Sequence, residues 1–209
     1  MEDVVHFSPG TGFNFALRAD GSLWGWANNS GRRYGPGLPT THPAPVFIMD
    51  GVAYAKISGD VIFGHTSNFF VVTADGRLLA WGQNHRGQLG DGTTVQRFSP
   101  VHIMDNIVSV AAGRNNTFAL DTSGRLWGWG RNTVEGGGTG IIGDGSGQHQ
   151  YTPVHIMDDV VSVESGRGIR GPGDFTMALR TDGSLWTWGV LLGEPAYEPV
   201  HVMDGVLLP

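Results

Sequence analysis

The chain has 209 residues, of which 40% are hydrophobic and 15% charged, so it can bury a core and is not expected to be disordered. Its formal net charge of −6 argues against binding nucleic acid through a general basic surface. The absence of cysteine excludes disulfides, thiolate metal sites and cysteine nucleophiles. Neither a signal-peptide core nor an apolar run of membrane-spanning length is found, which predicts a soluble protein, favours the cytoplasm and argues against a membrane partner.

The first segment, residues 1–49, is predicted to form four short strands, with the sequences DVVHFSPG, FALRA, LWGWA and PVFIM. An Asp-Gly pair between the second and third strands is a strong hairpin signal and predicts a two-residue turn. The proline of PVFIM is expected at the start of its strand, where no ladder N–H is missed. The 34 glycines of the chain likewise indicate tight turns and closely packed strands rather than helices.

The third predicted strand places Trp24 and Trp26 on either side of Gly25. An alternation of large and absent side chains suits a β-strand, because residues i and i+2 share one face. We expect the two tryptophans to pack between adjacent sheets and Gly25 to let the neighbouring sheet come close.

The same order of parts recurs along the whole chain. The hairpin glycines, which are separated by 55, 48 and 59 residues, are Gly21, Gly76, Gly124 and Gly183. Four units of this kind predict an all-β fold, a β-propeller of four four-stranded antiparallel blades in a single domain. The predicted blades are residues 1–49, 50–104, 105–157 and 158–209. Closure as a monomer is favoured, because the tail VMDGVLLP can dock where a strand preceding the first blade would lie, and a homodimeric eight-bladed ring is the alternative.

The segment LLAWGQNHRGQLGDGT, residues 78–93, resembles the signature of the regulator-of-chromosome-condensation repeat family. The resemblance covers the chain as four units and is specific in the second. Unit one has ANNSGRRYGPG instead, unit three carries the insertion TVEGGGTG, and unit four lacks the segment. Members of this family typically form seven-bladed propellers that act as binding platforms, among them exchange factors for small GTPases and a propeller-type inhibitor of β-lactamase. The resemblance therefore implies a binding protein.

All variation in loop length is predicted on one face of the propeller. Chain direction alternates between strands, so the loops after the first and third strands of each blade lie together, opposite the uniform hairpins. Variable loops on a rigid scaffold are where binding usually resides. We predict a non-catalytic module that recognises a protein partner through this face. The candidate partner-binding residues are Arg32, Arg33, Tyr34, His85, Arg86 and Tyr151.

A second hypothesis places a small anionic ligand at the propeller axis. The loops GDVIFGHTSN and GRGIRGPGDF follow first strands and should border the axial opening. Guanidinium and backbone N–H groups on a glycine-rich loop are suited to hold an anion. The candidate axial residues are Asp60, His65, Arg114, Arg167 and Arg170.

A lyase or hydrolase at the same opening is the third hypothesis. Its only titratable candidates besides the arginines are Asp60, His65 and Asp174, so no catalytic residue is assigned and no cofactor is expected. No metal is expected either. The histidines His102, His155 and His201 occupy one repeated position on the fourth strands, too far apart to share an ion, and are predicted to be structural.

Overall fold

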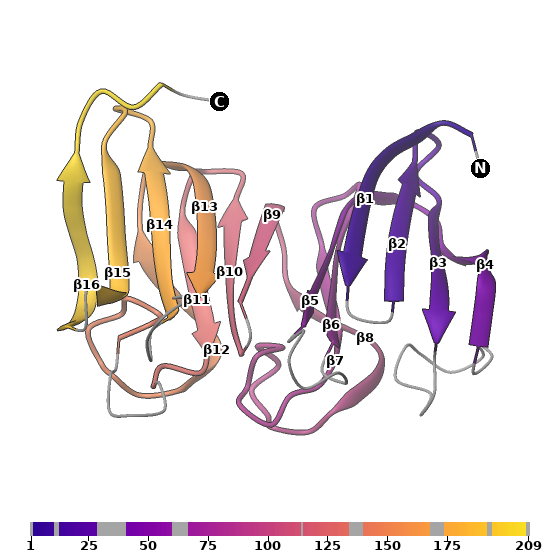
Figure 1. Cartoon of the computed structure of the whole chain (residues 1–209), viewed down its shortest axis with the longest axis horizontal. Helices are drawn as coiled ribbons and strands as arrows, with labels where there is room; N and C mark the ends of the chain where they lie inside the picture. The colour runs from indigo at the N-terminus through magenta and orange to yellow at the C-terminus, as the bar shows by residue number, and fades with distance from the viewer. Residues whose placement is uncertain are drawn as a thin grey trace. The chain divides into compact units, whose positions relative to one another are not determined.

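A computed structural model describes residues 2–10, 13–28, 41–59, 67–113, 115–133, 140–167, 174–191 and 194–207. Sixteen β-strands and no helix are found over these ranges (Figure 1), and in particular no helix able to cross a membrane. In chain order the strands are β1 (Val4–Gly10), β2 (Phe13–Arg18), β3 (Leu23–Asn28), β4 (Thr41–Met49), β5 (Val52–Gly59), β6 (Ser67–Thr73), β7 (Leu78–Gly82), β8 (Arg97–Met104), β9 (Ile107–Ala112), β10 (Asn116–Asp121), β11 (Leu126–Gly130), β12 (Gln150–Met157), β13 (Val160–Arg167), β14 (Asp174–Arg180), β15 (Leu185–Leu191) and β16 (Glu194–Met203).

The strands form four four-stranded sheets, β1–β4, β5–β8, β9–β12 and β13–β16, in which consecutive strands are hydrogen-bonded neighbours (Figure 1). This arrangement confirms the predicted all-β fold of four four-stranded antiparallel units. The chain divides into two compact units. Unit 1 comprises Met1–His85 and Val95–Ser109, and unit 2 comprises Arg86–Thr94 and Val110–Pro209. The loop of residues 86–94 thus belongs to unit 2, although the strands on either side of it belong to unit 1.

The hairpin between β2 and β3 is three residues long rather than two. The N–H of Arg18 donates to the carbonyl of Ser22, and the N–H of Gly21 donates to the carbonyl of Arg18, both at 3.0 Å. Gly21 has a φ of 81°, as a type I turn followed by a one-residue bulge requires. The same pair of bonds closes the hairpins at Gly76, Gly124 and Gly183. The predicted two-residue turn is wrong, because the glycine supplies the left-handed bulge position.

The carbonyl of the hairpin glycine also contacts the segment that follows the sheet. In unit 1 the N–H of Val52, which opens β5, donates to Gly21 O at 3.0 Å. In unit 2 the N–H of Val160, which opens β13, donates to Gly124 O at 2.8 Å. Val206, beyond β16, makes the same bond to Gly183 at 3.0 Å. One repeated backbone bond therefore ties neighbouring sheets together within each unit.

The proline of the fourth strand lies inside that strand, not at its start as predicted. In the third sheet β12 begins at Gln150, three residues before Pro153. The register of β11 and β12 shifts here, so residues 151–153 stand opposite a single residue of β11. The same shift recurs at the same place in the other three sheets. A bulged residue needs no ladder partner, so the missing N–H of proline is tolerated.

The second aromatic position of the tryptophan strand is buried in the second, third and fourth sheets, whereas Trp26 of the first sheet, for which this packing was predicted, is only half-buried. In unit 1, Trp81 is 1% exposed, stacks on Phe69 of its own sheet at 5.3 Å, and lies 6.2 Å from Phe15 of the preceding sheet. In unit 2, Trp188 is fully buried and meets Phe118 of the preceding sheet edge-on at 5.8 Å. Such aromatic pairs add about 1 kcal/mol each beyond the area that they bury.

The first tryptophan position behaves differently from the prediction. Trp24 and Trp186 are only half-buried and contact the outer strand of their own sheet, at Phe47 (5.8 Å) and His201 (5.4 Å) respectively. The reason for the glycine between the tryptophans also differs. A Cβ at Gly25 would lie 2.5 Å from Cζ of Phe13, so the glycine makes room for a ring of its own sheet.

Candidate functional site

The loop between β7 and β8 contains the signature segment, and residues 83–94 are called the signature loop here. Its middle is buried in unit 2. The carbonyl of Gln88 accepts hydrogen bonds from Trp129 Nε1 (3.0 Å) and Thr117 Oγ1 (2.9 Å), and Leu89 is fully buried. Gly90, with a φ of 83°, lies against the same indole, because a Cβ there would sit 2.7 Å from Nε1 of Trp129. These contacts fix the loop on the third sheet.

The loop between β11 and β12, described for residues 131–133 and 140–149, lies on the fourth sheet through an equivalent glycine and a buried aliphatic residue. Ile142 is fully buried, and a Cβ at Gly143 would lie 2.7 Å from Nε1 of Trp188. Unlike Trp129, Trp188 makes no hydrogen bond through Nε1 within the described residues. The side chain of Asn132 closes this loop instead, because its Oδ1 accepts the N–H of Ile142 (2.9 Å) and its Nδ2 donates to Asp144 (2.8 Å).

Two of the predicted partner-binding residues come together on the signature loop. Tyr151, the second residue of β12, is 43% exposed, and its ring packs so closely against Gly87 that a Cβ there would overlap with Cδ1 of the ring. Arg86, the neighbour of Gly87, is exposed. His85 is exposed at the preceding position. The other three candidates, Arg32, Arg33 and Tyr34, lie outside the described residues.

The predicted axial residues are mostly outside the described part of the chain. Asp60, His65, Arg114 and Arg170 fall there. Arg167 is described only in its backbone, which pairs with Asp174 at the ends of β13 and β14. The anionic-ligand hypothesis therefore stays a prediction.

Two further residues, which the sequence analysis missed, join Arg86 in unit 2. Arg131 follows β11 and is 9% exposed, and His149 is half-buried just before β12. Burial, then the positive charges of Arg86 and Arg131, lower the pKa of His149. Arg86, Arg131 and His149 are called the basic cluster. The sequence offered no signal for it, because the residues come from two loops of different length.

Hydrogen bonds through the side chains of Gln88, Asn115 and His149 connect the backbone segments that carry the basic cluster. Gln88 Oε1 accepts the N–H of Arg86 at 2.9 Å, and Gln88 Nε2 donates to Asn115 Oδ1 at 3.3 Å. The carbonyl of Asn115 in turn accepts the N–H of Arg131 at 2.7 Å. His149 joins through its Nδ1, which accepts the N–H of Asn132 at 3.1 Å. The side chains of the cluster therefore stand on a hydrogen-bonded frame.

The charge environment of Arg86 differs from that of three other arginines in the described chain. Arg18, Arg125 and Arg180 each face a carboxylate, at 3.2, 2.9 and 2.9 Å respectively. For Arg125 the partner is Asp121, which is 4% exposed. None of the ion pairs between the described residues involves Arg86.

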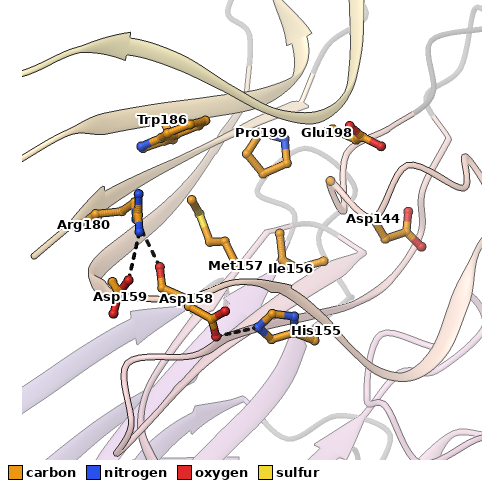
Figure 2. A pocket seen from close by; sticks show the side chains of 11 residues that line it. Asp144, His155, Ile156, Met157, Asp158, Asp159, Arg180, Trp186, Glu198 and Pro199 are labelled. Atoms are coloured by element: carbon orange, nitrogen blue, oxygen red, sulfur yellow. Dashed lines mark hydrogen bonds and ion pairs between the residues drawn. The ribbon is translucent and has the colours of Figure 1, made fainter.

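A separate groove of about 510 Å³ lies in unit 2 beside β12, β15 and β16 (Figure 2). Arg180 donates to the carboxylate of Asp159 (2.9 Å) and to the carbonyl of Asp158 (3.2 Å). The carboxylate of Asp158 is 2.9 Å from Nε2 of His155. The same residue types recur beside the first sheet, in a hollow lined by Glu2, Arg18, Trp24 and Pro45. This repetition and the internal pairing indicate a structural feature of the repeat.

The repeated histidines of the outer strands are part of the same feature. His102, His155 and His201 each lie 2.8–2.9 Å from the aspartate three residues later. Each pair joins a strand to the short link that follows it, which fits the structural role predicted for these histidines. In the portion of the chain with described coordinates, no three histidine or carboxylate side chains gather as they would around a metal ion.

The chain forms four four-stranded antiparallel sheets, and the same backbone bond to the hairpin glycine recurs from sheet to sheet. These features define a β-propeller repeat protein. The model for the regulator of chromosome condensation (RCC1) repeat matches residues 75–120, and a second RCC1 repeat model matches residues 107–135. Residues 75–135 therefore contain RCC1 repeats, the family that the signature segment resembles. The matched segments contain the signature loop and its anchor on β10.

Relatives of known name are much longer than this chain. The human E3 ubiquitin-protein ligase HERC2 is 29% identical over 186 residues, which are 83% of this chain and 4% of that protein. The RCC1 domain-containing protein RUG3 of Arabidopsis thaliana is 33% identical over 133 residues, 61% of this chain and 29% of that protein. The ultraviolet-B receptor UVR8 of Arabidopsis thaliana is 28% identical over 173 residues, 79% of this chain and 36% of the receptor.

Solved structures show the same fold. Yeast RCC1 (Prp20), in its complex with Kap60, matches with a TM-score of 0.73 at 21% identity, over 96% of this chain and 49% of that one. Human WBSCR16 matches with a TM-score of 0.71 at 22% identity, over 96% of this chain and 53% of that one. This chain therefore spans about half the length of the propeller structures that it resembles.

Proposed function

We propose that this RCC1-repeat chain is a non-catalytic binding module that recognises a protein partner through the face carrying the signature loop. One observation carries the proposal: hydrogen bonds from Trp129 and Thr117 fix the signature loop, on which Arg86 is exposed next to Gly87, and the half-exposed ring of Tyr151 packs against that glycine. Preorganised residues lose little conformational freedom on binding, which favours affinity. Arginine and tyrosine are also the residue types enriched at the energetic centres of protein interfaces.

The hairpins support the same choice of loops. All four hairpins are three residues long and closed by the same two backbone bonds. Hairpins built four times in the same way offer little to distinguish a partner, whereas the loops between the third and fourth strands differ in length and charge.

Related proteins with solved structures bind other proteins. One structure holds yeast RCC1 (Prp20) bound to Kap60, and another reports the binding properties of Prp20p to Gsp1p and histones. A protein partner is therefore the class of ligand that we infer here, and its identity does not follow from theirs.

The proposal is tested by affinity capture followed by quantitative mass spectrometry. The double variant Arg86→Ala/Tyr151→Ala removes the presented pair. The matched control is Arg77→Ala/Tyr197→Ala, because Arg77 is exposed in unit 1 and Tyr197 holds on β16 the position that Tyr151 holds on β12, with a similar exposed fraction of 42% and its backbone against Gly140. We expect a protein that is captured by the wild type and the control and lost with the double variant. Equal capture by all three proteins would contradict the proposal.

A further inference from the structure

We propose that three polar side chains between the third and fourth sheets, those of Asn116, Ser165 and Thr176, bind a neutral carbonyl oxygen of a small molecule. The three residues are called the polar triad, and all of them lie in unit 2. Neither the repeat pattern nor the signature segment singles them out. The inference goes beyond the proposed function and does not depend on it.

The polar triad comes together from two sheets. Asn116 begins β10 and is 2% exposed, and Thr176 lies on β14 and is fully buried. Ser165 of β13 is the Cα partner of Thr176, and such partners point to the same face of a sheet. A Cβ at Gly113 would overlap with Oδ1 of Asn116 and lie 2.9 Å from Oγ of Ser165. The side chains of the third and fourth sheets therefore meet at this glycine.

The equivalent positions in unit 1 are apolar. Ile57 and Phe69 are Cα partners across β5 and β6, and they hold the places of Ser165 and Thr176. Phe13 begins β2 and holds the place of the asparagine of the polar triad. Phe13 meets Phe69 edge-on at 5.5 Å, and all three apolar residues are at most 5% exposed. The first and second sheets are thus closed at this level by apolar packing, which the third and fourth sheets lack.

Each member of the polar triad has a buried polar atom without a hydrogen-bond partner among the described residues. These atoms are Nδ2 of Asn116, Oγ of Ser165 and Oγ1 of Thr176. A buried polar group that makes no hydrogen bond is unfavourable, and nearly all such groups in native proteins are paired. An oxygen placed among the three atoms would supply the partner that each of them needs.

The chemistry of the polar triad specifies the kind of oxygen. The amide Nδ2 of Asn116 can only donate, and a hydroxyl group can turn its O–H towards an acceptor. A carbonyl oxygen accepts more than one such bond. The three side chains are uncharged, and burial of an anion without a cation is costly, so a neutral carbonyl fits better than a carboxylate.

The burial of the surrounding residues allows a small molecule to enter. Gly113, Ser165 and Gly166 are only partly buried, whereas Asn116 and Thr176 are buried. Each side chain of the polar triad is also smaller than the apolar side chain at the equivalent place in unit 1. We therefore expect a ligand of a few non-hydrogen atoms, such as a small amide.

The test follows the side chains of the polar triad by NMR in the full 209-residue chain during a titration with acetamide. We expect saturable shifts of the side-chain amide of Asn116 and of the methyl group of Thr176. Acetate has nearly the same size and carries a charge, so it should cause no such shifts. Absence of a response to acetamide would overturn the proposal, and so would an equal response to acetate. A nuclear Overhauser contact of Thr176 with water that persists at saturating acetamide would assign the place to an ordered water and overturn the small molecule.

Three variants make the test specific. Thr176→Val and Ser165→Ala each remove one hydroxyl group, so each should weaken the binding of acetamide about fivefold, as expected for one lost hydrogen bond. Ser162→Ala is the matched control, because Ser162 is half-buried on the same strand and points to the opposite face. It should bind acetamide as the wild type does. Unchanged binding in both Thr176→Val and Ser165→Ala would contradict the proposal. No protein partner takes part in these measurements, so their outcome is independent of the proposed function.

Discussion

The signature loop and the loop between β11 and β12 share their glycine anchors and differ in the side chains beside them. Gly90 and Gly143 each lie against a buried indole, and the N–H groups of Gly92 and Gly145 each donate to a tyrosine carbonyl at 2.9 Å. On the signature loop the ring of Tyr151 packs against Gly87, next to the exposed Arg86. Beside Gly145, in contrast, lies the carboxylate of Glu198. The comparison indicates that the anchors specify the fold, and we propose that the positions between them carry recognition.

The largest effects are expected from the buried aliphatic anchors. Leu89→Ala and Ile142→Ala each empty a fully buried position, which should lower the free energy of unfolding by about 3–4 kcal/mol. Urea denaturation followed by tryptophan fluorescence measures both. Leu207→Ala, at a residue that is 91% exposed, is the control and should be nearly neutral. A loss of stability in only one of the two variants would show that Leu89 and Ile142 are not equivalent anchors.

The glycine anchors should give the next largest effects. Gly90→Ala combines a left-handed φ of 83° with a contact to a buried indole, so we expect a loss of about 3 kcal/mol, and a similar loss for Gly143→Ala. Gly51→Ala isolates the backbone term, because its φ is 69° and nothing lies within 4 Å of the added Cβ. It should lose only about 1 kcal/mol in the same denaturation assay. Equal losses of stability at Gly51 and Gly90 would show that the contact with the Trp129 indole adds nothing to the cost of the substitution.

The smallest effect is the pH dependence that distinguishes the basic cluster. His149 has a pKa below its ordinary 6.5 in the folded chain, so the unfolded chain takes up the proton first as the pH falls. Its contribution to stability is complete above pH 6.5 and is lost as the pH falls towards the folded pKa. Thermal melts at pH 7.5, 6.5 and 5.5 should show this loss in the wild type and a smaller one in Arg86→Gln. The same loss of stability in both proteins would show that Arg86 does not lower the pKa of His149.

Much of the fold could be predicted from the sequence because the repeat supplies four readings of each element. The hairpin glycines and the tryptophan strands defined the sheets and their order. The predictions that were wrong concern local backbone geometry, which the residue types at a position do not determine. The hairpin at Gly21 uses a bulge, and Pro153 lies in a bulge inside its strand, neither of which a residue pattern distinguishes from its alternative.

The candidate site was predictable only in part, for a related reason. Arg86 and Tyr151 stood out because they lie in the long loops between third and fourth strands, and the structure packs the ring of Tyr151 against Gly87, the neighbour of Arg86. Arg131 and His149 approach Arg86 only because the signature loop crosses to unit 2, where Gln88 binds Trp129 and Thr117. A contact of this kind depends on how loops of unequal length fold, which one sequence does not specify.

The most direct test of the central claim is the dissociation constant of the captured partner, measured by isothermal titration calorimetry with wild type, Arg86→Ala and Arg77→Ala. If the exposed positions of the signature loop carry recognition, Arg86→Ala should weaken binding at least about tenfold, which corresponds to about 1.4 kcal/mol, with an unchanged melting temperature. Arg77→Ala should bind as the wild type does. The same dissociation constant for Arg86→Ala and the wild type would contradict the claim.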